Sequence, residues 1–226
     1  MNRCGYNIVD IVEIIDLNSM EIDMKIALAG SAGTGRTTIA IRVAEAIGHV
    51  PLTNLAKTIL KEEGFRYGTD QTVEEFLATN YRQRRLFQFK QENEAKNSDF
   101  VTDRSWIDLA AYCIQGMQSQ IDFDMASFIE DCRAEVEKYD VIIHIPWGRQ
   151  PLQSNGTRTI NPWFQFIIDS IIYRMANQWK LEMIEVPVEC GNPDAIKWVL
   201  ESIQLLDPSI IIKPTEEEND PNSEET

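Results

Sequence analysis

A glycine-rich run between an apolar segment and a helical segment limits what this chain can fold into more than any other feature. Residues 26–28 are apolar, residues 30–38 read Gly-Ser-Ala-Gly-Thr-Gly-Arg-Thr-Thr, and residues 39–44 have the pattern of a helix. The run matches the phosphate-binding pattern G-x-x-x-x-G-K-[ST] at every fixed position except the lysine, which is Arg36 here. Because such a loop joins a strand to a helix, the run predicts an α/β fold that binds the phosphates of a nucleotide.

The residues of this run have the chemistry that a phosphate chain requires. Glycine leaves room for successive backbone N–H groups to converge on phosphate oxygens. Thr37 has a hydroxyl that would hold Mg²⁺ between two phosphates, whereas Arg36 keeps the positive charge of lysine on a longer, forked group. The residues expected to bind ATP are Gly30, Ser31, Ala32, Gly33, Thr34, Gly35, Arg36, Thr37 and Thr38. The alternative is a glycine-rich turn without a ligand, which would not need this whole constellation.

Acidic residues outnumber basic residues and gather at the two ends of the chain. The 226 residues include 36 acidic and 21 basic ones, which gives a formal net charge of −15. Residues 215–226 contain six acids and no base, so this tail is expected to be disordered. We expect one domain over residues 24–213, an extension of undecided order over residues 1–23 and an acidic tail over residues 214–226.

Composition argues against several classes of function. A duplex nucleic-acid binder would need a basic stripe, which so acidic a chain does not favour. No apolar run is long enough to cross a membrane, and the first residues lack the pattern of a signal peptide. Four scattered cysteines fit a reducing compartment; they are Cys4, Cys113, Cys132 and Cys190. The sequence therefore predicts a cytoplasmic protein that acts on a small molecule, and a homodimer stays open.

Strand-like apolar runs alternate with helical patterns, which predicts a parallel sheet with helices on both faces. The expected strands are residues 25–29, 49–52, 99–102, 141–145 and 183–188. The expected helices are residues 37–47, 56–63, 72–79, 81–96, 107–115, 123–139, 162–178 and 194–206. Ligands of such sheets bind at the carboxyl ends of the strands. The glycine-rich run, residues 103–105 and the loop that begins at Trp147 should therefore converge on one crevice.

Residues 103–105 read Asp-Arg-Ser and directly follow a strand-like run. Asp103 could hold Mg²⁺ through water or accept a proton from an attacking hydroxyl group, and Arg104 could clamp a phosphate of the acceptor. The alternative is a helix N-terminus that Asp103 or Ser105 caps. Both interpretations can hold together, since a cap does not exclude a ligand.

Residues 147–161 form a polar loop with the composition of a lid. Long loops inside compact domains are usually functional lids or disordered segments. Arg158 lies just before the next helix, where it would neutralise the charge that spreads over a transferred phosphoryl group. The alternative is a solvated surface loop.

The expected helix over residues 81–96 is rich in basic and amide side chains. Arg82, Arg85 and Gln88 are candidates to contact the acceptor, because Arg85 and Gln88 share one face of the helix. A solvated helix with apolar residues packed below it explains the same pattern equally well.

Three segments resemble the P-loop nucleoside and nucleotide kinases. They are residues 30–38, residues 103–112, and the run Asn155-Gly156-Thr157-Arg158 followed by Asn161, Pro162 and Asp169. The resemblance covers roughly residues 24–206 and includes deoxynucleoside monophosphate kinases (often phage-encoded), thymidylate kinase, and the ATPase/kinase group that contains nicotinamide riboside kinases. It implies a five-stranded parallel sheet, ATP with Mg²⁺ as the donor, a lid arginine at Arg158, and an adenine-facing loop over residues 190–193.

The sequence departs from these kinases at two places. One is Arg36, and the other is the segment 52–57, which lacks the carboxylate that many relatives use as a base. A monophosphate acceptor depends less on a base because its phosphate is already anionic, and Lys57 would help to hold it.

These observations together predict ATP-dependent phosphoryl transfer to a (deoxy)nucleoside monophosphate. The residues expected to carry the transfer are Arg36, Asp103, Arg104 and Arg158. One alternative is a nucleoside or nicotinamide riboside kinase. The other is a regulatory protein that binds nucleotide without turnover.

Overall fold

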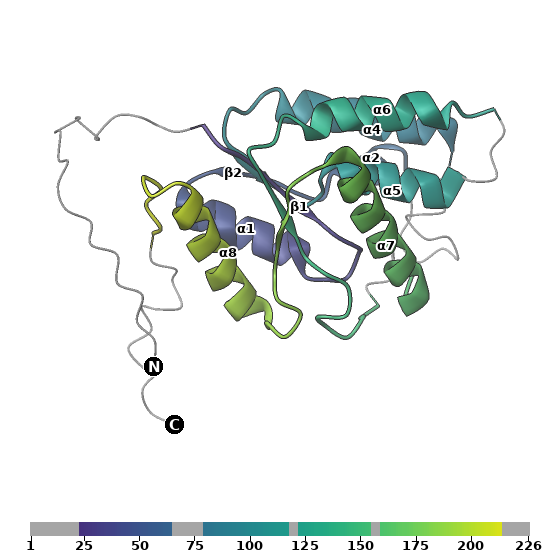
Figure 1. The fold of residues 1–226 in the computed structure, drawn as a ribbon. Helices are drawn as coiled ribbons and strands as arrows, with labels where there is room; N and C mark the ends of the chain where they lie inside the picture. The colour runs from purple at the N-terminus through teal and green to yellow at the C-terminus, as the bar shows by residue number, and fades with distance from the viewer. Residues whose placement is uncertain (1–22, 65–78, 118–121, 155–158, 214–226) are drawn as a thin grey trace, which may run out of the picture.

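The core of the molecule is a parallel β-sheet. The computed structural model describes residues 23–64, 79–117, 122–154 and 159–213, and among these it has a five-stranded sheet in the order β2-β3-β1-β4-β5 (Figure 1). All four strand pairs are parallel. The strands are β1 (Lys25–Ala29), β2 (Val50–Leu52), β3 (Phe100–Thr102), β4 (Val141–His144) and β5 (Ile184–Glu185). The α/β fold class that the sequence predicts is confirmed.

Helices cover both faces of the sheet (Figure 1). One face packs against α1 (Arg36–Ile47) and α8 (Asn192–Leu206). The other face is covered by α2 (Leu55–Glu62), α4 (Asn80–Glu94), α5 (Trp106–Met117), α6 (Met125–Val136) and α7 (Pro162–Trp179). Each layer has its own hydrophobic core, so the sheet separates two buried clusters.

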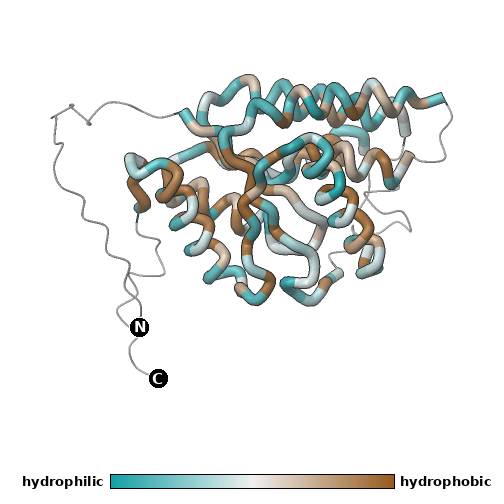
Figure 2. The backbone as a smooth tube through the Cα atoms, viewed as in Figure 1, coloured by the Kyte–Doolittle hydropathy of each residue, from teal (hydrophilic) through white to brown (hydrophobic). Residues whose placement is uncertain are grey.

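The central strand β1 shows why the sheet forms here. Its last four residues are completely buried, because parallel strands between two helical layers have no solvent-facing side. Ile26 and Leu28 pack into the core with α1 and α8, whereas Ala29 packs into the core on the opposite face. The central strands are accordingly mainly brown, the colour of apolar residues, in Figure 2.

Local signals set the ends of the helices. Helix α1 begins directly after Gly35 and ends at Gly48, and both glycines have a positive φ that other residues rarely adopt. Helix α7 begins after Asn161, whose side chain accepts a hydrogen bond from the backbone N–H of Trp163, and Pro162 occupies its first position.

Most expected elements agree with the observed ones to within one or two residues at each end, and the differences are larger at β5 and α6. Strand β5 has two residues rather than the expected run 183–188, since its partner β4 ends at His144, whose carbonyl oxygen accepts from the N–H of Val186 at 3.0 Å. Helix α6 begins at Met125 rather than at residue 123, since Asp124 caps it by accepting from the N–H of Ser127. Residues 72–78 of the expected helix 72–79, residues 1–22 of the expected extension 1–23, and the tail 214–226 lie outside the described residues.

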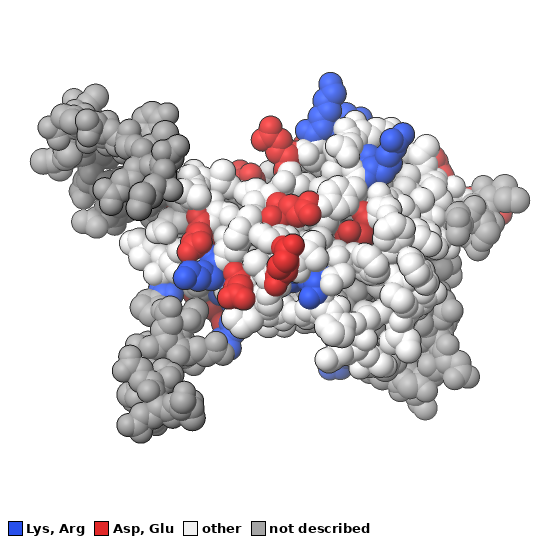
Figure 3. Space-filling model, turned by 60° about the horizontal axis from the view of Figure 1, so that its bottom comes forward, with Lys and Arg blue, Asp and Glu red and all other residues white. Residues whose placement is uncertain are grey.

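The surface carries both signs of charge. On the face that Figure 3 shows, basic residues occur as separate spots among acidic ones and form no continuous stripe. None of the described helices is both long enough and apolar enough to cross a membrane.

Candidate nucleotide-binding site

The loops that follow β1, β3 and β4 meet at the carboxyl ends of these strands. Backbone hydrogen bonds join Ser105 N–H to the carbonyl oxygen of Leu28 and Ile145 N–H to that of Ala29. Gly30 has a φ of 144°, and a Cβ atom at this position would lie 2.3 Å from the carbonyl oxygen of Ile145. The first glycine of the run is therefore required by the close approach of the chain after β4.

Thr37 and Asp103 form the contact between the glycine-rich loop and the loop after β3. The hydroxyl of Thr37 donates to Asp103 Oδ2 at 2.6 Å. Asp103 Oδ2 also accepts from the N–H of Asn54, 3.4 Å away, at the start of α2. A hydroxyl and a carboxylate are the hard oxygen ligands that Mg²⁺ prefers. No group of three or more His, Cys, Asp or Glu side chains that could hold a metal occurs among the described residues. A metal ion here would thus also need oxygens from a ligand.

Arg36 contacts a residue for which sequence reasoning gave no role. Its Nη1 atom donates to Oδ1 of Asp108 on α5, and the side chains of both residues are almost completely inaccessible to solvent. Burial by itself lowers the pKa of Arg36, but the charge of Asp108, with smaller contributions from Tyr112 and Asp103, leaves that pKa raised above its ordinary value. Arg36 therefore stays charged and lies against a carboxylate within the structure.

Arg104 and the glycine-rich loop are joined by Tyr112. The hydroxyl of Tyr112 accepts from the backbone N–H of Ala32 at 2.8 Å. The guanidinium of Arg104 lies over the ring of the same tyrosine, 4.7 Å from its centroid, which is the geometry of a cation–π contact. Arg104 is only half-buried.

The expected lid begins with an anchored segment. Arg149 donates to the carbonyl oxygens of Thr34 in the glycine-rich loop at 3.0 Å and of Cys190 at 2.8 Å. The same side chain reaches the carbonyl oxygen of Gly191 at 3.2 Å, and burial lowers its pKa. Arg149 thus ties the glycine-rich loop to the loop before α8. Arg158, the expected lid arginine, lies outside the described residues.

A contact between a buried histidine and an aspartate supports the start of the same segment. His144 at the end of β4 lies 3.0 Å from Asp169 on α7, and the other oxygen of Asp169 accepts from the N–H of Trp147 at 3.4 Å. These contacts fix where the chain leaves the sheet before Arg149.

The expected acceptor residues are not all brought to this place. Arg82 pairs with Glu63 and Arg85 with Glu62, at the far end of α2 from Asn54. A helix rises 1.5 Å per residue, so these pairs lie about 12 Å along α2 from the contact with Asp103. Lys57 is exposed on the first turn of α2, and Gln88 is exposed on α4.

Sequence reasoning gave no role to Asp108 and Tyr112, and of the two arginines in the lid loop it preferred Arg158 to Arg149. A signal for the first two existed, because residues four apart on the helix after Asp-Arg-Ser share one face. That face of α5 contacts the glycine-rich loop. No comparable signal marks Arg149, whose partners are backbone carbonyls.

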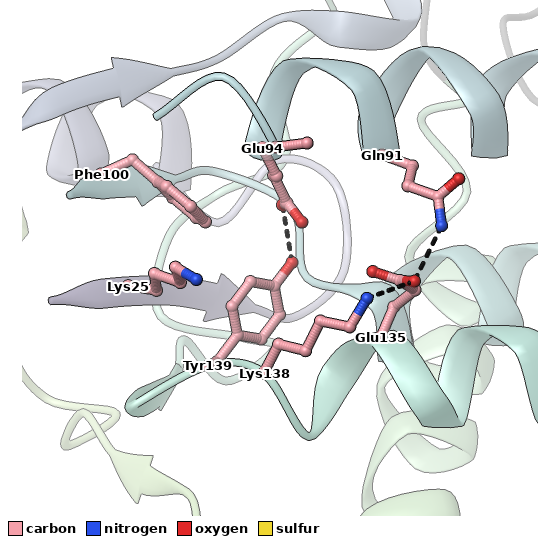
Figure 4. Close-up of a pocket in the computed structure, with 8 residues that line it drawn as sticks. Lys25, Gln91, Glu94, Phe100, Glu135, Lys138 and Tyr139 are labelled. Carbon is pink, nitrogen blue, oxygen red and sulfur yellow. Dashed lines mark hydrogen bonds and ion pairs between the residues drawn. The ribbon is translucent and has the colours of Figure 1, made fainter. Parts of the chain in front are cut away.

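A pocket at the other end of the sheet is separate from this site. Lys25 and Phe100, the first residues of β1 and β3, line it together with residues of α4 and α6 (Figure 4). The amino ends of the strands lie there, whereas the glycine-rich loop lies at their carboxyl ends.

The fold and this loop define the class of the protein. A parallel sheet with β1 at its centre, followed by a glycine-rich loop and α1, is the P-loop NTPase fold, as the sequence predicts. The chain matches the AAA domain family over residues 25–192, most of its length, and belongs to that family. No curated protein matches the sequence.

Solved structures share this fold at low sequence identity. NadR in complex with NR has a TM-score of 0.63 at 13% identity, covering 85% of this chain and 53% of that one. NadR with NAD and AMP-PNP has a TM-score of 0.55 at 16% identity, covering 85% and 51%. Deoxyadenosine kinase from M. mycoides with dCMP and dCDP has a TM-score of 0.54 at 12% identity, covering 81% and 100%. This chain therefore spans about half the length of NadR, and these likenesses show the fold.

Proposed function

We propose that this protein transfers the γ-phosphoryl group of ATP to a (deoxy)nucleoside monophosphate, with Mg²⁺ as the metal ion. The observation that carries the proposal is the hydrogen bond between Thr37 and Asp103. It joins the phosphate-binding loop to the loop after β3, and Arg104 is the next residue along the chain. Proteins of the same fold bind AMP-PNP in one case and the products dCMP and dCDP in another, which supports nucleotides as ligands of this site.

The donor would lie along the glycine-rich loop. In the proposal, backbone N–H groups of residues 30–38 and the side chain of Arg36 hold its phosphates, while Thr37 and Asp103 hold Mg²⁺. When bound, Mg²⁺ neutralises charge on the donor phosphates. The buried hydroxyl of Ser31 and Nε of Arg149 have no hydrogen-bond partner in the described part of the chain, and a phosphate or ribose would offer acceptors to both.

The acceptor phosphate would meet Arg104 and Lys57. Neither side chain forms an ion pair with a carboxylate among the residues that the structure describes, so their charge is available to an anionic ligand. Arg82 and Arg85 are already paired with glutamates, so an acceptor would compete for them. Arg158 is the proposed source of positive charge for the transferred phosphoryl group.

The proposal is tested by measuring the ADP that forms from ATP when matched pairs of a nucleoside and its monophosphate are offered as acceptors. Monophosphates should be phosphorylated much faster than their parent nucleosides, and chelation of Mg²⁺ should abolish the difference. Arg104→Ala should reduce transfer far more than it reduces ATP binding, because Arg104 would touch the acceptor. If the protein binds ATP but forms no ADP with any acceptor, the result would favour the alternative that the sequence leaves open, a regulatory protein that binds nucleotide without turnover.

A nucleoside or nicotinamide riboside kinase is the second candidate. The fold likeness to NadR in complex with NR favours it, and Asp103 is the carboxylate that would serve as the base. If nucleosides or nicotinamide riboside react faster than monophosphates, this function replaces the first. Asp103→Asn should then abolish the pH dependence of kcat on its acidic side.

A further inference from the structure

Asp108 is the most heavily hydrogen-bonded carboxylate beneath the glycine-rich loop. It is completely buried, and its Oδ1 accepts from the N–H of Gly30 at 3.1 Å and from Nη1 of Arg36. Its Oδ2 accepts from the N–H of Ser105 at 2.9 Å and from the hydroxyl of the same residue at 2.6 Å. One side chain therefore holds the start of the loop, the arginine at its end and the start of α5.

The chemistry of arginine makes this contact different from that of a lysine. A guanidinium has N–H donors on three nitrogens in a fixed plane, so one arm can contact Asp108 while the others stay available. The ammonium of lysine is a compact charge on a flexible stem and has no second arm in a fixed direction. Burial also makes the pairing obligatory, because an unpaired charge in this place would be strongly unfavourable.

We infer that Asp108 is a positioning residue for the donor, which holds Arg36 across the loop so that the remaining N–H groups of its guanidinium face the terminal phosphates. The inference rests on the proposed function, since it assumes that the loop binds a nucleoside triphosphate. It gives two tasks to Arg36, which stands where the phosphate-binding pattern has lysine: the side chain serves a carboxylate and a phosphate at once. Tyr112, one turn further along α5, holds the middle of the loop through Ala32.

ATP and ADP binding to Asp108→Asn and Arg36→Lys, in the full chain, tests this assignment. Each variant should lose about tenfold in affinity for ATP and clearly less for ADP, because the lost contact is to the terminal phosphate. The double variant should bind ATP no more weakly than either single one, since the two residues act as a unit. Arg42→Lys on the exposed side of α1 is the matched control and should bind ATP as the unmodified protein does.

Equal losses for ATP and ADP would assign Asp108 a merely structural role and overturn the inference. Additive losses in the double variant, or an Arg36→Lys protein that binds ATP normally, would overturn it as well. Arg36→Lys keeps the buried charge, so it provides the result if Asp108→Asn does not fold. The proposed function can fail separately from this inference. That would be the result if the unmodified protein binds ATP, and the variants lose affinity for ATP more than for ADP, yet the unmodified protein phosphorylates no acceptor.

Discussion

Lys90 illustrates how far single residues of this protein depend on one partner. Its side chain is completely inaccessible to solvent, yet its ammonium contacts Glu94 on the next turn of α4. Glu94 also accepts from the indole N–H of Trp106 at 2.7 Å. It accepts as well from the hydroxyl of Tyr139 at 2.8 Å, a contact drawn in Figure 4. Burial, followed by the charge of Glu94, raises the pKa of Tyr139 well above its usual range. Glu94 is thus the common acceptor of a buried network.

Glu94→Gln should destabilise the protein strongly. The buried ammonium of Lys90 would lose its counter-charge, and breaking a buried pair in this way removes about 3–5 kcal/mol from the free energy of unfolding. Urea denaturation followed by circular dichroism measures the loss. Tyr139→Phe is the control, because it removes one hydrogen bond and leaves the charge pair, so it should cost about 1 kcal/mol. Comparable losses for the two variants would mean that the ion pair is not what matters.

Individual residues of the candidate site could be predicted from the sequence only where a motif has a fixed position. Thr37 and Asp103 were identified separately, one from the glycine-rich spacing and one from its place after a strand, and the structure brings them into contact. The pairing of Arg36 with Asp108 was not predicted: the spacing places Asp108 and Tyr112 on one face of a helix, but it does not say which side chain that face contacts. Which side chains meet across two elements depends on packing that no spacing records.

At the scale of elements, the loops around α1 and α8 are tied together through Arg149. Its contacts are all to backbone carbonyls, namely those of Thr34, Cys190 and Gly191. A charged donor to a neutral acceptor gives a stronger hydrogen bond than two neutral groups do. Arg149 therefore joins these two loops to each other through its side chain, without sheet or helix hydrogen bonds.

Arg149→Ala should loosen both loops. The loss of these bonds should lower the free energy of unfolding by about 1–3 kcal/mol. Amide hydrogen exchange in residues 189–192 and in the glycine-rich loop should accelerate, while exchange in β1 stays slow. Arg174→Ala, which changes an exposed arginine on α7, should leave both measurements unchanged. Unchanged exchange in Arg149→Ala would show that the loops are held by their own packing.

Most elements could be predicted from the sequence because their signals are local. The expected strand 25–29 agrees with β1 residue for residue, and the expected helices 37–47 and 162–178 lie within a residue of α1 and α7. Strand β5 was predicted too long because the largely apolar run 183–188 looks like a strand, whereas its partner β4 ends at His144, opposite Glu185. The family resemblance implied five parallel strands, but the order β2-β3-β1-β4-β5 was not predicted, since periodicity says nothing of which strands are neighbours.

For the whole molecule, the described chain ends in contact with its core. The N–H of Lys213 donates to the carbonyl oxygen of Ala46 at 2.8 Å, and Ile210 is buried against the layer of α1 and α8. The acidic tail that begins at residue 214 has no apolar residue, so it can bury little on folding.

Two truncations should therefore behave differently. Deleting residues 214–226 should leave the melting temperature and ATP binding almost unchanged. Deleting residues 208–226 also removes Ile210, and the loss of this buried side chain should lower the free energy of unfolding by about 2–5 kcal/mol. Thermal unfolding of the two shortened chains, compared with the full chain, measures the difference. A large effect of the shorter deletion would show that the acidic tail packs on the domain.

The contacts made by Arg149 have a consequence for how the protein folds during its synthesis. Arg149 lies 115 positions after Thr34 and 41 before Cys190, so its contacts join segments that leave the ribosome far apart in time. A nascent chain that includes the glycine-rich loop but not Cys190 cannot yet form these contacts. A ligand that binds only the completed site would therefore stabilise the chain only after synthesis has passed the loop before α8.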